Sequence, residues 1–114
     1  MIKTYAAMSK GSSLELFEYE AAPLNSNEVN IKVESCGICH SDICAIDGSW
    51  GISKYPMVAG HEVIGEIIDT GSNVSLHKIG DRVGLGWHSG YCNDCEQCDV
   101  GDHNFCSATK KTVF

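Results

Sequence analysis

The stretch GYCNDCEQCDVGDHNFC, residues 90–106, places four cysteines close together near one end of a 114-residue chain. Two residues separate each of the first three cysteines, and seven residues separate the third from the fourth. Four thiolates can close a tetrahedron around zinc, and such a site leaves no coordination position open for chemistry. The stretch therefore predicts a structural zinc lobe over about residues 87–110. Its expected ligands are Cys92, Cys95, Cys98 and Cys106.

Two other uses of these thiols stay open. An iron–sulfur cluster uses a similar run of cysteines, but the bacterial ferredoxin version continues with three residues and a Cys-Pro pair. Here Cys106 comes later and Ser107 follows it. Disulfides are the second alternative, which the odd number of seven cysteines and the absence of a secretory signal pattern disfavour. Zinc is the favoured interpretation.

The length and net charge of the chain limit the number of domains and the kinds of partner that it can have. A chain of 114 residues suits one domain with a core of its own. The formal net charge of -7, with only eight lysines and arginines, offers no electrostatic footprint for nucleic acid or an anionic membrane surface. No apolar run approaches the roughly 18 residues that a membrane span needs. We expect a cytoplasmic chain without nucleic-acid or membrane partners.

The hydrophobic pattern predicts short strands and one short helix. Val29, Ile31 and Val33 alternate with polar residues, as in a half-buried strand. A helix is expected over residues 40–46, because Asp42 suits its first turn and Gly48 suits its end. The pattern favours a small, mainly β barrel or sandwich. Strands are expected at residues 2–7, 14–20, 29–34, 62–69 and 81–86.

The first cysteine cluster, CGICHSD at residues 36–42, suggests half of a metal site. Cys39 supplies a soft ligand, and His61 in the run YPMVAGHEVIGE supplies a second ligand type. A catalytic zinc needs three protein ligands and an open position, and two cysteines with one histidine form one known set. A thioredoxin-like redox pair is the alternative, but it would need a βαβ context. Cys36 and Cys44 are expected to be small buried hydrophobic residues.

Three motifs together resemble one family. CGICHSD, then GHEVIGEIIDTGSNV, then KIGDRVGLGWHSGYCNDCEQCDVGDHNFC are similar in order and spacing to the N-terminal GroES-like domain of zinc-dependent alcohol dehydrogenases of the medium-chain dehydrogenase/reductase superfamily. The branch of cinnamyl alcohol dehydrogenases and aldehyde reductases is the most similar. The resemblance covers nearly the whole chain and implies a mainly β, partly open GroES-like barrel with short helices.

The resemblance implies a role for each matching residue. Cys39 and His61 would bind catalytic zinc, and Glu62 would approach the metal when water or substrate exchanges. Asp42 would orient the zinc-bound histidine. Ser41 would relay the alcohol proton, with His40 behind it near the cofactor. Substrate-pocket walls are implied at two positions, although each could equally be a core tryptophan: Trp50 and Trp87.

The implied activity is the interconversion of alcohols and aldehydes with a nicotinamide cofactor, NADP(H) more than NAD(H). Family members also carry a Rossmann domain and a third catalytic zinc ligand, which we expect beyond residue 114. The nearest glycine pattern, GLGWHS at residues 84–89, has Ser89 in place of the third glycine and is rejected as a nucleotide site. We therefore expect a fragment that is itself inactive and that self-associates into a homo-oligomer through exposed apolar surface.

A second class of function stays open. A stand-alone zinc-binding or interaction module would use only the four-cysteine lobe. The motifs around Cys39 and His61 favour the enzyme, because a binding module has no need for half of a catalytic site.

Overall fold

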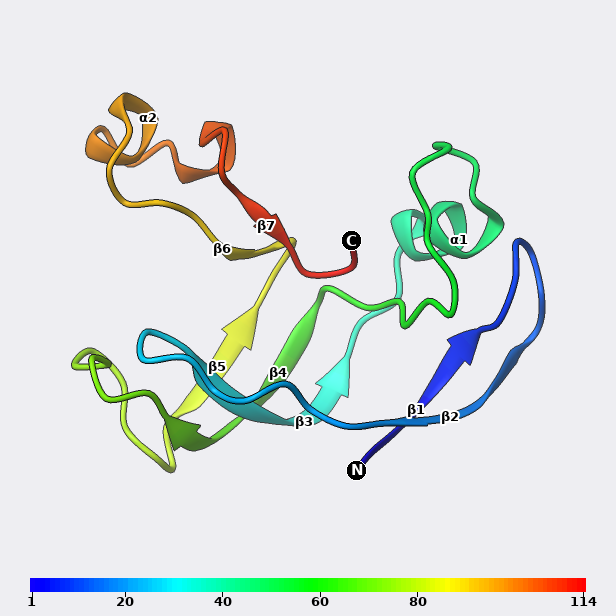
Figure 1. Ribbon diagram of the computed structural model, residues 1–114, viewed down its shortest axis with the longest axis horizontal. Helices are drawn as coiled ribbons and strands as arrows, with labels where there is room; N and C mark the ends of the chain where they lie inside the picture. The colour runs from blue at the N-terminus through cyan, green and yellow to red at the C-terminus, as the bar shows by residue number, and fades with distance from the viewer.

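The computed structural model describes all residues from Met1 to Phe114. Seven short strands and three short helical segments follow one another along the chain (Figure 1). The strands are β1 (Ile2–Ala7), β2 (Leu14–Tyr19), β3 (Val29–Cys36), β4 (Val63–Thr70), β5 (Arg82–Leu85), β6 (His88–Gly90) and β7 (Lys110–Lys111). The helical segments are α1 (His40–Asp47), α2 (Glu96–Asp99) and the 3-10 turn η1 (His103–Phe105).

The first two strands form an antiparallel hairpin that stands apart from the other strands in Figure 1. Its turn is held by the Ser12 hydroxyl, which accepts hydrogen bonds from the backbone N–H groups of Met8 and Ser9. At the end of β1, Ala7 exchanges two backbone hydrogen bonds with Met57, at 2.9 and 2.8 Å. This exchange joins the hairpin to the segment that precedes the second metal-ligand candidate, His61.

The central sheet has the order β3-β4-β5, with antiparallel neighbours. Its register pairs Cys36, the first residue of the CGIC motif, with Val63, which directly follows the GHE motif, so that the two motifs lie next to each other. Ile67 on β4 is the one large side chain that is fully buried. The sheet therefore brings together two motifs that are more than twenty residues apart in the chain.

Helix α1 begins and ends at residues with clear capping roles. Cys39 is the N-cap, and its thiol accepts a hydrogen bond from the backbone N–H of Ser41 at 3.3 Å. The Asp42 carboxylate in turn accepts one from the backbone N–H of Cys39 at 3.0 Å, which completes a capping box. Gly48 ends the helix with φ of 64°, a left-handed conformation that glycine adopts without a side-chain penalty.

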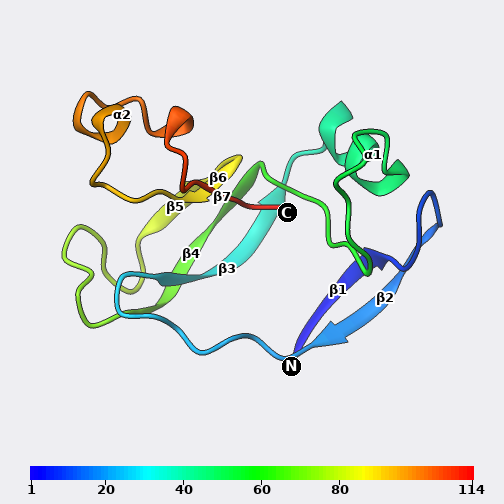
Figure 2. The same cartoon turned by 45° about the horizontal axis from the view of Figure 1, so that its top comes forward.

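The four-cysteine lobe lies between β6 and β7, at one end of the molecule (Figure 2). These two strands pair His88 with Lys111 and Gly90 with Lys110. The chain therefore enters and leaves the lobe at neighbouring positions. Within the lobe, α2 carries Cys98 and η1 immediately precedes Cys106.

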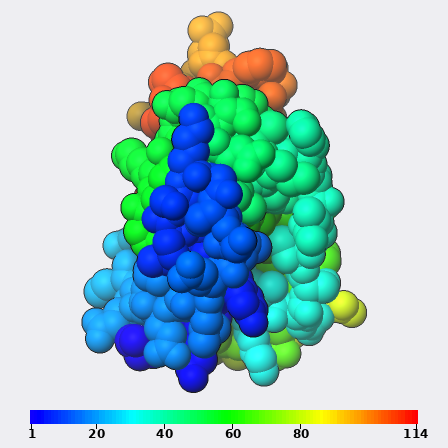
Figure 3. All heavy atoms as spheres, turned by 90° about the vertical axis from the view of Figure 1, so that its right-hand side faces the viewer, coloured from blue at the N-terminus to red at the C-terminus, as the bar shows by residue number.

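Much apolar surface is exposed in this arrangement. Only 10 of 114 residues are buried, and the accessible surface is 7829 Å², against about 6,100 Å² for a folded monomer of this mass. The radius of gyration is 15.1 Å, where about 13 Å is usual for this length. In the space-filling view the hairpin lies in front of residues 51–60, and the lobe projects beyond them (Figure 3). None of the helices is long and apolar enough to cross a membrane.

The expected strands and the helix from residue 40 are present with small differences at their ends. Three details differ from the expectation. The strands form three separate small sheets, and Val33 is 56% exposed although the alternation placed it with the buried residues of its strand. Four elements inside and around the lobe were not predicted. They are only two to four residues long and lie beside the cysteines, and they are too short to show a hydrophobic period. These are β6, α2, η1 and β7.

Candidate metal centres

The four thiols of the lobe converge on one point. The Sγ atoms of Cys92, Cys95, Cys98 and Cys106 all lie within 4.8 Å of one another. Cys92 Sγ is 3.4 Å from Cys106 Sγ and 3.9 Å from Cys98 Sγ. A tetrahedron with Zn–S bonds of about 2.3 Å has S–S edges of about 3.8 Å, whereas a disulfide bond is about 2.0 Å long. The donor set and its spacing therefore fit zinc and not a disulfide.

Backbone N–H groups surround the lobe sulfurs. Cys106 Sγ accepts hydrogen bonds from Cys92 N and Ala108 N, and Cys92 Sγ accepts one from Asp94 N. The N–H of Cys92 is the main cause that lowers the pKa of Cys106 to about 7. Burial raises the pKa of Cys98 to about 12. A cation is what would hold the buried Cys98 as a thiolate beside its neighbours.

A second group of ligands forms at the start of α1. His61 Nε2 lies 3.3 Å from Cys39 Sγ, and His61 Nδ1 lies 3.1 Å from Asp42 Oδ1. A zinc ion bound by both Cys39 and His61 would place their ligand atoms about 3.6 Å apart. The observed separation fits that geometry closely, so these two side chains can share one metal ion.

Asp42 holds both members of this pair in place. Its Oδ2 accepts from the backbone N–H of Cys39, while its Oδ1 faces Nδ1 of His61. Asp42 and His61 are 6% and 8% exposed. With the Nδ1–H group donating to the carboxylate, the Nε2 lone pair is directed toward Cys39. This is the tautomer that a histidine requires in order to bind a metal ion through Nε2.

The other residues expected at this site lie around the pair. Glu62 is exposed, and its carboxylate lies against Gly37, outside the group of ligand atoms within 4.8 Å. Ser41 is half-buried beside Cys39, and His40 is exposed at the first position of α1. The contacts of these three residues do not test a role in catalysis or cofactor binding. The roles of Glu62, Ser41 and His40 therefore stay predictions.

An aromatic cluster lies against the histidine of this site. The Trp87 ring is nearly perpendicular to the His61 ring, with centroids 4.8 Å apart. Trp50 and Phe114 each pack on Trp87, with centroids 6.1 Å away. Trp50 is 45% exposed, so it is not a core residue. Trp87 is therefore the aromatic side chain that directly borders the candidate metal position.

The expectation for the remaining cysteines was wrong in one case. Cys36 is exposed, because it ends β3 at the edge of the sheet and does not point into a core. Its Sγ lies beside Gly60, which leaves room for it. Cys44 is half-buried on α1 and belongs to neither ligand group.

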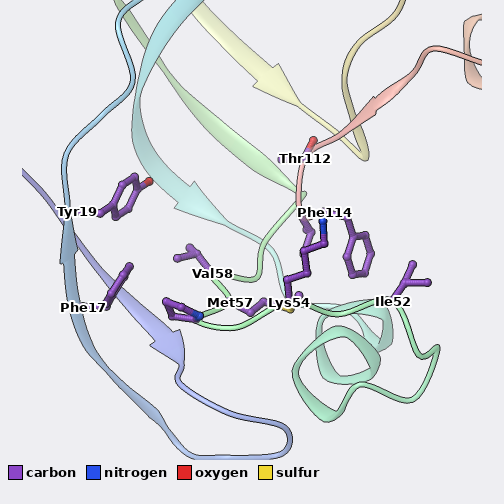
Figure 4. Close-up of a pocket in the computed structure, with 10 residues that line it drawn as sticks. Phe17, Tyr19, Ile52, Lys54, Met57, Val58, Thr112 and Phe114 are labelled. Atoms are coloured by element: carbon purple, nitrogen blue, oxygen red, sulfur yellow. The ribbon is translucent and has the colours of Figure 1, made fainter.

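A cavity of about 550 Å³ opens next to the aromatic cluster. In Figure 4, Phe17 and Tyr19 on β2 lie on one side, with Val58 between them and the chain end at Phe114. Thr112 lines the same space. Sequence reasoning missed Phe114 and Thr112, because no motif or hydrophobic period marks a residue that reaches a site through the end of the chain.

A small β domain with a closed four-thiol site and an open cysteine–histidine site is characteristic of zinc-dependent dehydrogenases. Residues 25–113 match the family described as the alcohol dehydrogenase GroES-like domain, so the chain belongs to that family.

Curated relatives and solved structures agree with this assignment. The chain is 50% identical over 113 residues to an aldehyde reductase, AdhA, of Synechocystis sp., with 99% of this chain and 34% of that protein covered. It is 38% identical over 111 residues to a probable cinnamyl alcohol dehydrogenase of Oryza sativa, with 97% and 31% covered. The chain thus spans about a third of the length of these relatives.

Two solved structures share the fold closely. A cinnamyl alcohol dehydrogenase of Sorghum bicolor superposes with a TM-score of 0.90 at 38% identity, over 96% of this chain and 31% of that one. The cinnamyl alcohol dehydrogenase of Helicobacter pylori, complexed with NADP(H), superposes with a TM-score of 0.91 at 34% identity, over 96% and 32%. These similarities identify the mainly β fold as that of the GroES-like domain.

Proposed function

We propose that this chain is the metal-binding part of a zinc-dependent oxidoreductase that interconverts alcohols and aldehydes with a nicotinamide cofactor. One observation carries the proposal: His61 faces Cys39 with one ring nitrogen and a buried carboxylate with the other. A module that used zinc only for stability would need the four-cysteine lobe alone. The second, open pair of ligands is what a catalytic site adds.

The residues of the pair have separate tasks in this proposal. When bound, zinc supplies Lewis-acid polarisation of an alcohol or carbonyl oxygen. Cys39 and His61 hold the metal position, and Asp42 fixes the tautomer and direction of the imidazole. Ser41, two residues after Cys39 in the first turn of α1, carries a hydroxyl that can pass a proton between substrate and solvent. Glu62 is a further carboxylate within the same motif as His61.

The surroundings of the site and the relatives support a proposal for the substrate class and the cofactor. Trp87 packs against His61, and Trp50 packs on Trp87. Trp87 is half-buried and Trp50 is 45% exposed, so both can offer a flat apolar surface to a small molecule. We infer an alcohol or aldehyde with an apolar body. NADP(H) is preferred over NAD(H) in this proposal because the Helicobacter pylori neighbour is described as complexed with NADP(H). His40 is the residue of this chain that we assign to the cofactor side.

A metal titration tests the site itself. We expect the chain, with its lobe already zinc-filled, to bind one further equivalent of Co²⁺, with a thiolate-to-cobalt absorption band. His61→Ala should abolish that second binding and leave the lobe zinc intact. Cys44→Ser is the matched control, because its thiol belongs to neither ligand group. Unchanged cobalt binding by His61→Ala would refute the proposed site.

An activity assay tests the reaction class. In a longer protein that contains this chain, aldehyde-dependent oxidation of NADPH should depend on Cys39 and His61. Activity that survives the loss of either side chain would exclude a metal-dependent mechanism through this pair.

A further inference from the structure

The segment that leaves the four-cysteine lobe is fastened to the residues that precede it. The Thr112 backbone N–H donates to the carbonyl oxygen of Trp87 at 2.9 Å, and the Thr112 hydroxyl donates to that of Gly86 at 2.6 Å. Both bonds lie just outside the paired strands β6 and β7. They extend the ladder toward the centre of the molecule and fix the Trp87 backbone to the outgoing chain.

Trp87 connects this clamp with the candidate catalytic metal position. Its ring lies 4.8 Å from the His61 ring, nearly at a right angle. Phe114, two residues after Thr112, packs on the same indole. Trp87 is therefore held at its backbone by Thr112 and at its ring by Phe114, and both contacts come from the chain that has just left the lobe.

The Trp87 contact adds a restraint on the tilt of the His61 ring. Asp42 and Cys39 each face a ring nitrogen and so act along the plane of the imidazole. Neither restricts rotation of the ring about the line that joins them. The Trp87 contact does restrict it, because a perpendicular aromatic neighbour excludes other ring tilts. A ligand lone pair must point at its metal, so the tilt affects metal binding.

We propose that Thr112 is a positioning residue that couples zinc binding by the four cysteines of the lobe to metal binding by Cys39 and His61. The Trp87 ring is the connection between the two sites. Coupling between two sites is reciprocal, so metal at the cysteine–histidine pair also favours zinc binding in the lobe. The inference rests on the proposed function only in requiring that this pair binds a metal ion.

The experiment measures the fluorescence emission of Trp87. The chain has two tryptophans, so a Trp50→Phe background leaves Trp87 as the only indole. The lobe is first filled with one equivalent of Zn²⁺, and Co²⁺ is then titrated while quenching of Trp87 emission is followed. The test variant is Thr112→Val, which removes the hydroxyl and keeps the backbone N–H. Thr112→Ser restores the hydroxyl. Thr109→Val is the matched control, because that hydroxyl makes no hydrogen bond to the protein in the structure.

We expect Thr112→Val to weaken cobalt binding roughly fivefold, as the loss of one hydrogen bond would. Its Trp87 emission should shift to longer wavelength while its zinc content stays at one per chain. Thr112→Ser and Thr109→Val should match the background within about twofold, which is smaller than the effect of a typical hydrogen bond.

Three results would overturn the proposal, and they are distinguishable. Unchanged cobalt affinity and emission in Thr112→Val would show that the clamp does not reach His61. Loss of the lobe zinc in that variant would show that the hydroxyl only stabilises the lobe. Absence of cobalt quenching in the background protein would show that the pair binds no metal, which refutes the proposed function and the coupling with it.

Discussion

Asp42 Oδ1 lies 3.1 Å from His61 Nδ1, across a sequence separation of 19 residues. The other oxygen of the same carboxylate accepts a hydrogen bond from the backbone N–H of Cys39. One buried side chain therefore fixes the first turn of α1 and the direction of the histidine at the same time. Local helix capping and the assembly of the ligand pair depend on a single residue.

Replacement of Asp42 by Asn should weaken metal binding at the pair. An amide presents only one acceptor oxygen, so either the contact with His61 or the cap on Cys39 is lost. Loss of such a supporting carboxylate lowers metal affinity by about 10- to 100-fold. Cobalt titration with the zinc-filled lobe measures the effect. Asp47→Asn, at the exposed end of the same helix, is the control and should bind cobalt like the parent. Equal affinities for the two variants would contradict the assigned role of Asp42.

Ser41→Ala should separate proton transfer from metal binding. In a longer, active protein that contains this chain, turnover should fall by about 10²- to 10⁴-fold, the usual contribution of a positioned proton-transfer group. Zinc content should not change, because only the backbone N–H of Ser41 contacts the Cys39 thiol. Cys39→Ser should lose both activity and the second metal ion. If Ser41→Ala also lost that metal, its hydroxyl would have to be counted among the ligands.

Cys98→Ser should remove the lobe zinc and unfold the lobe. Structural zinc contributes about 10–16 kcal/mol in small domains, which is comparable with the whole stability of a domain at about 5–15 kcal/mol. Metal analysis after dialysis should find one colourless zinc per parent chain and none in the variant. Cys44→Ser should keep its zinc. A brown, iron-containing parent protein would instead support the iron–sulfur alternative.

The 114-residue chain should self-associate through its first hairpin. Tyr5 and Leu16 face each other across β1 and β2 and are 63% and 64% exposed. The surface in excess of that of a usual monomer is about 1,700 Å² per chain, roughly twice the 800 Å² or so that each partner buries in a standard protein–protein interface. Light scattering should find oligomers of the parent chain, and the double variant Tyr5→Ser, Leu16→Ser should be mainly monomeric. A monomeric parent chain would disprove this expectation.

The sequence predicted those parts of the structure that local chemistry determines. Asp42 and Gly48 marked the two ends of α1, and the spacing of the four lobe cysteines indicated a closed thiol site. Cys39 was expected as a ligand but not as the N-cap, because Ser, Thr, Asp and Asn are the residues preferred there.

Contacts between distant segments could not be predicted in the same way. The perpendicular packing of Trp87 on His61 joins residues from two different loops, and no periodicity encodes it. The exposure of Cys36 was missed for a related reason, since burial at the end of a strand depends on which segment passes over it. The short strands β6 and β7 carry no hydrophobic alternation that could have predicted them.

The pairing of Gly90 with Lys110 makes the lobe a self-contained insertion. Because its entry and exit positions already lie side by side, a two-residue hairpin turn is long enough to join them in place of the lobe. Evolution and engineering would then act on the lobe as one unit. Its four cysteines can be gained or lost together, whereas a lineage that lost only one would keep a loop with no metal to order it.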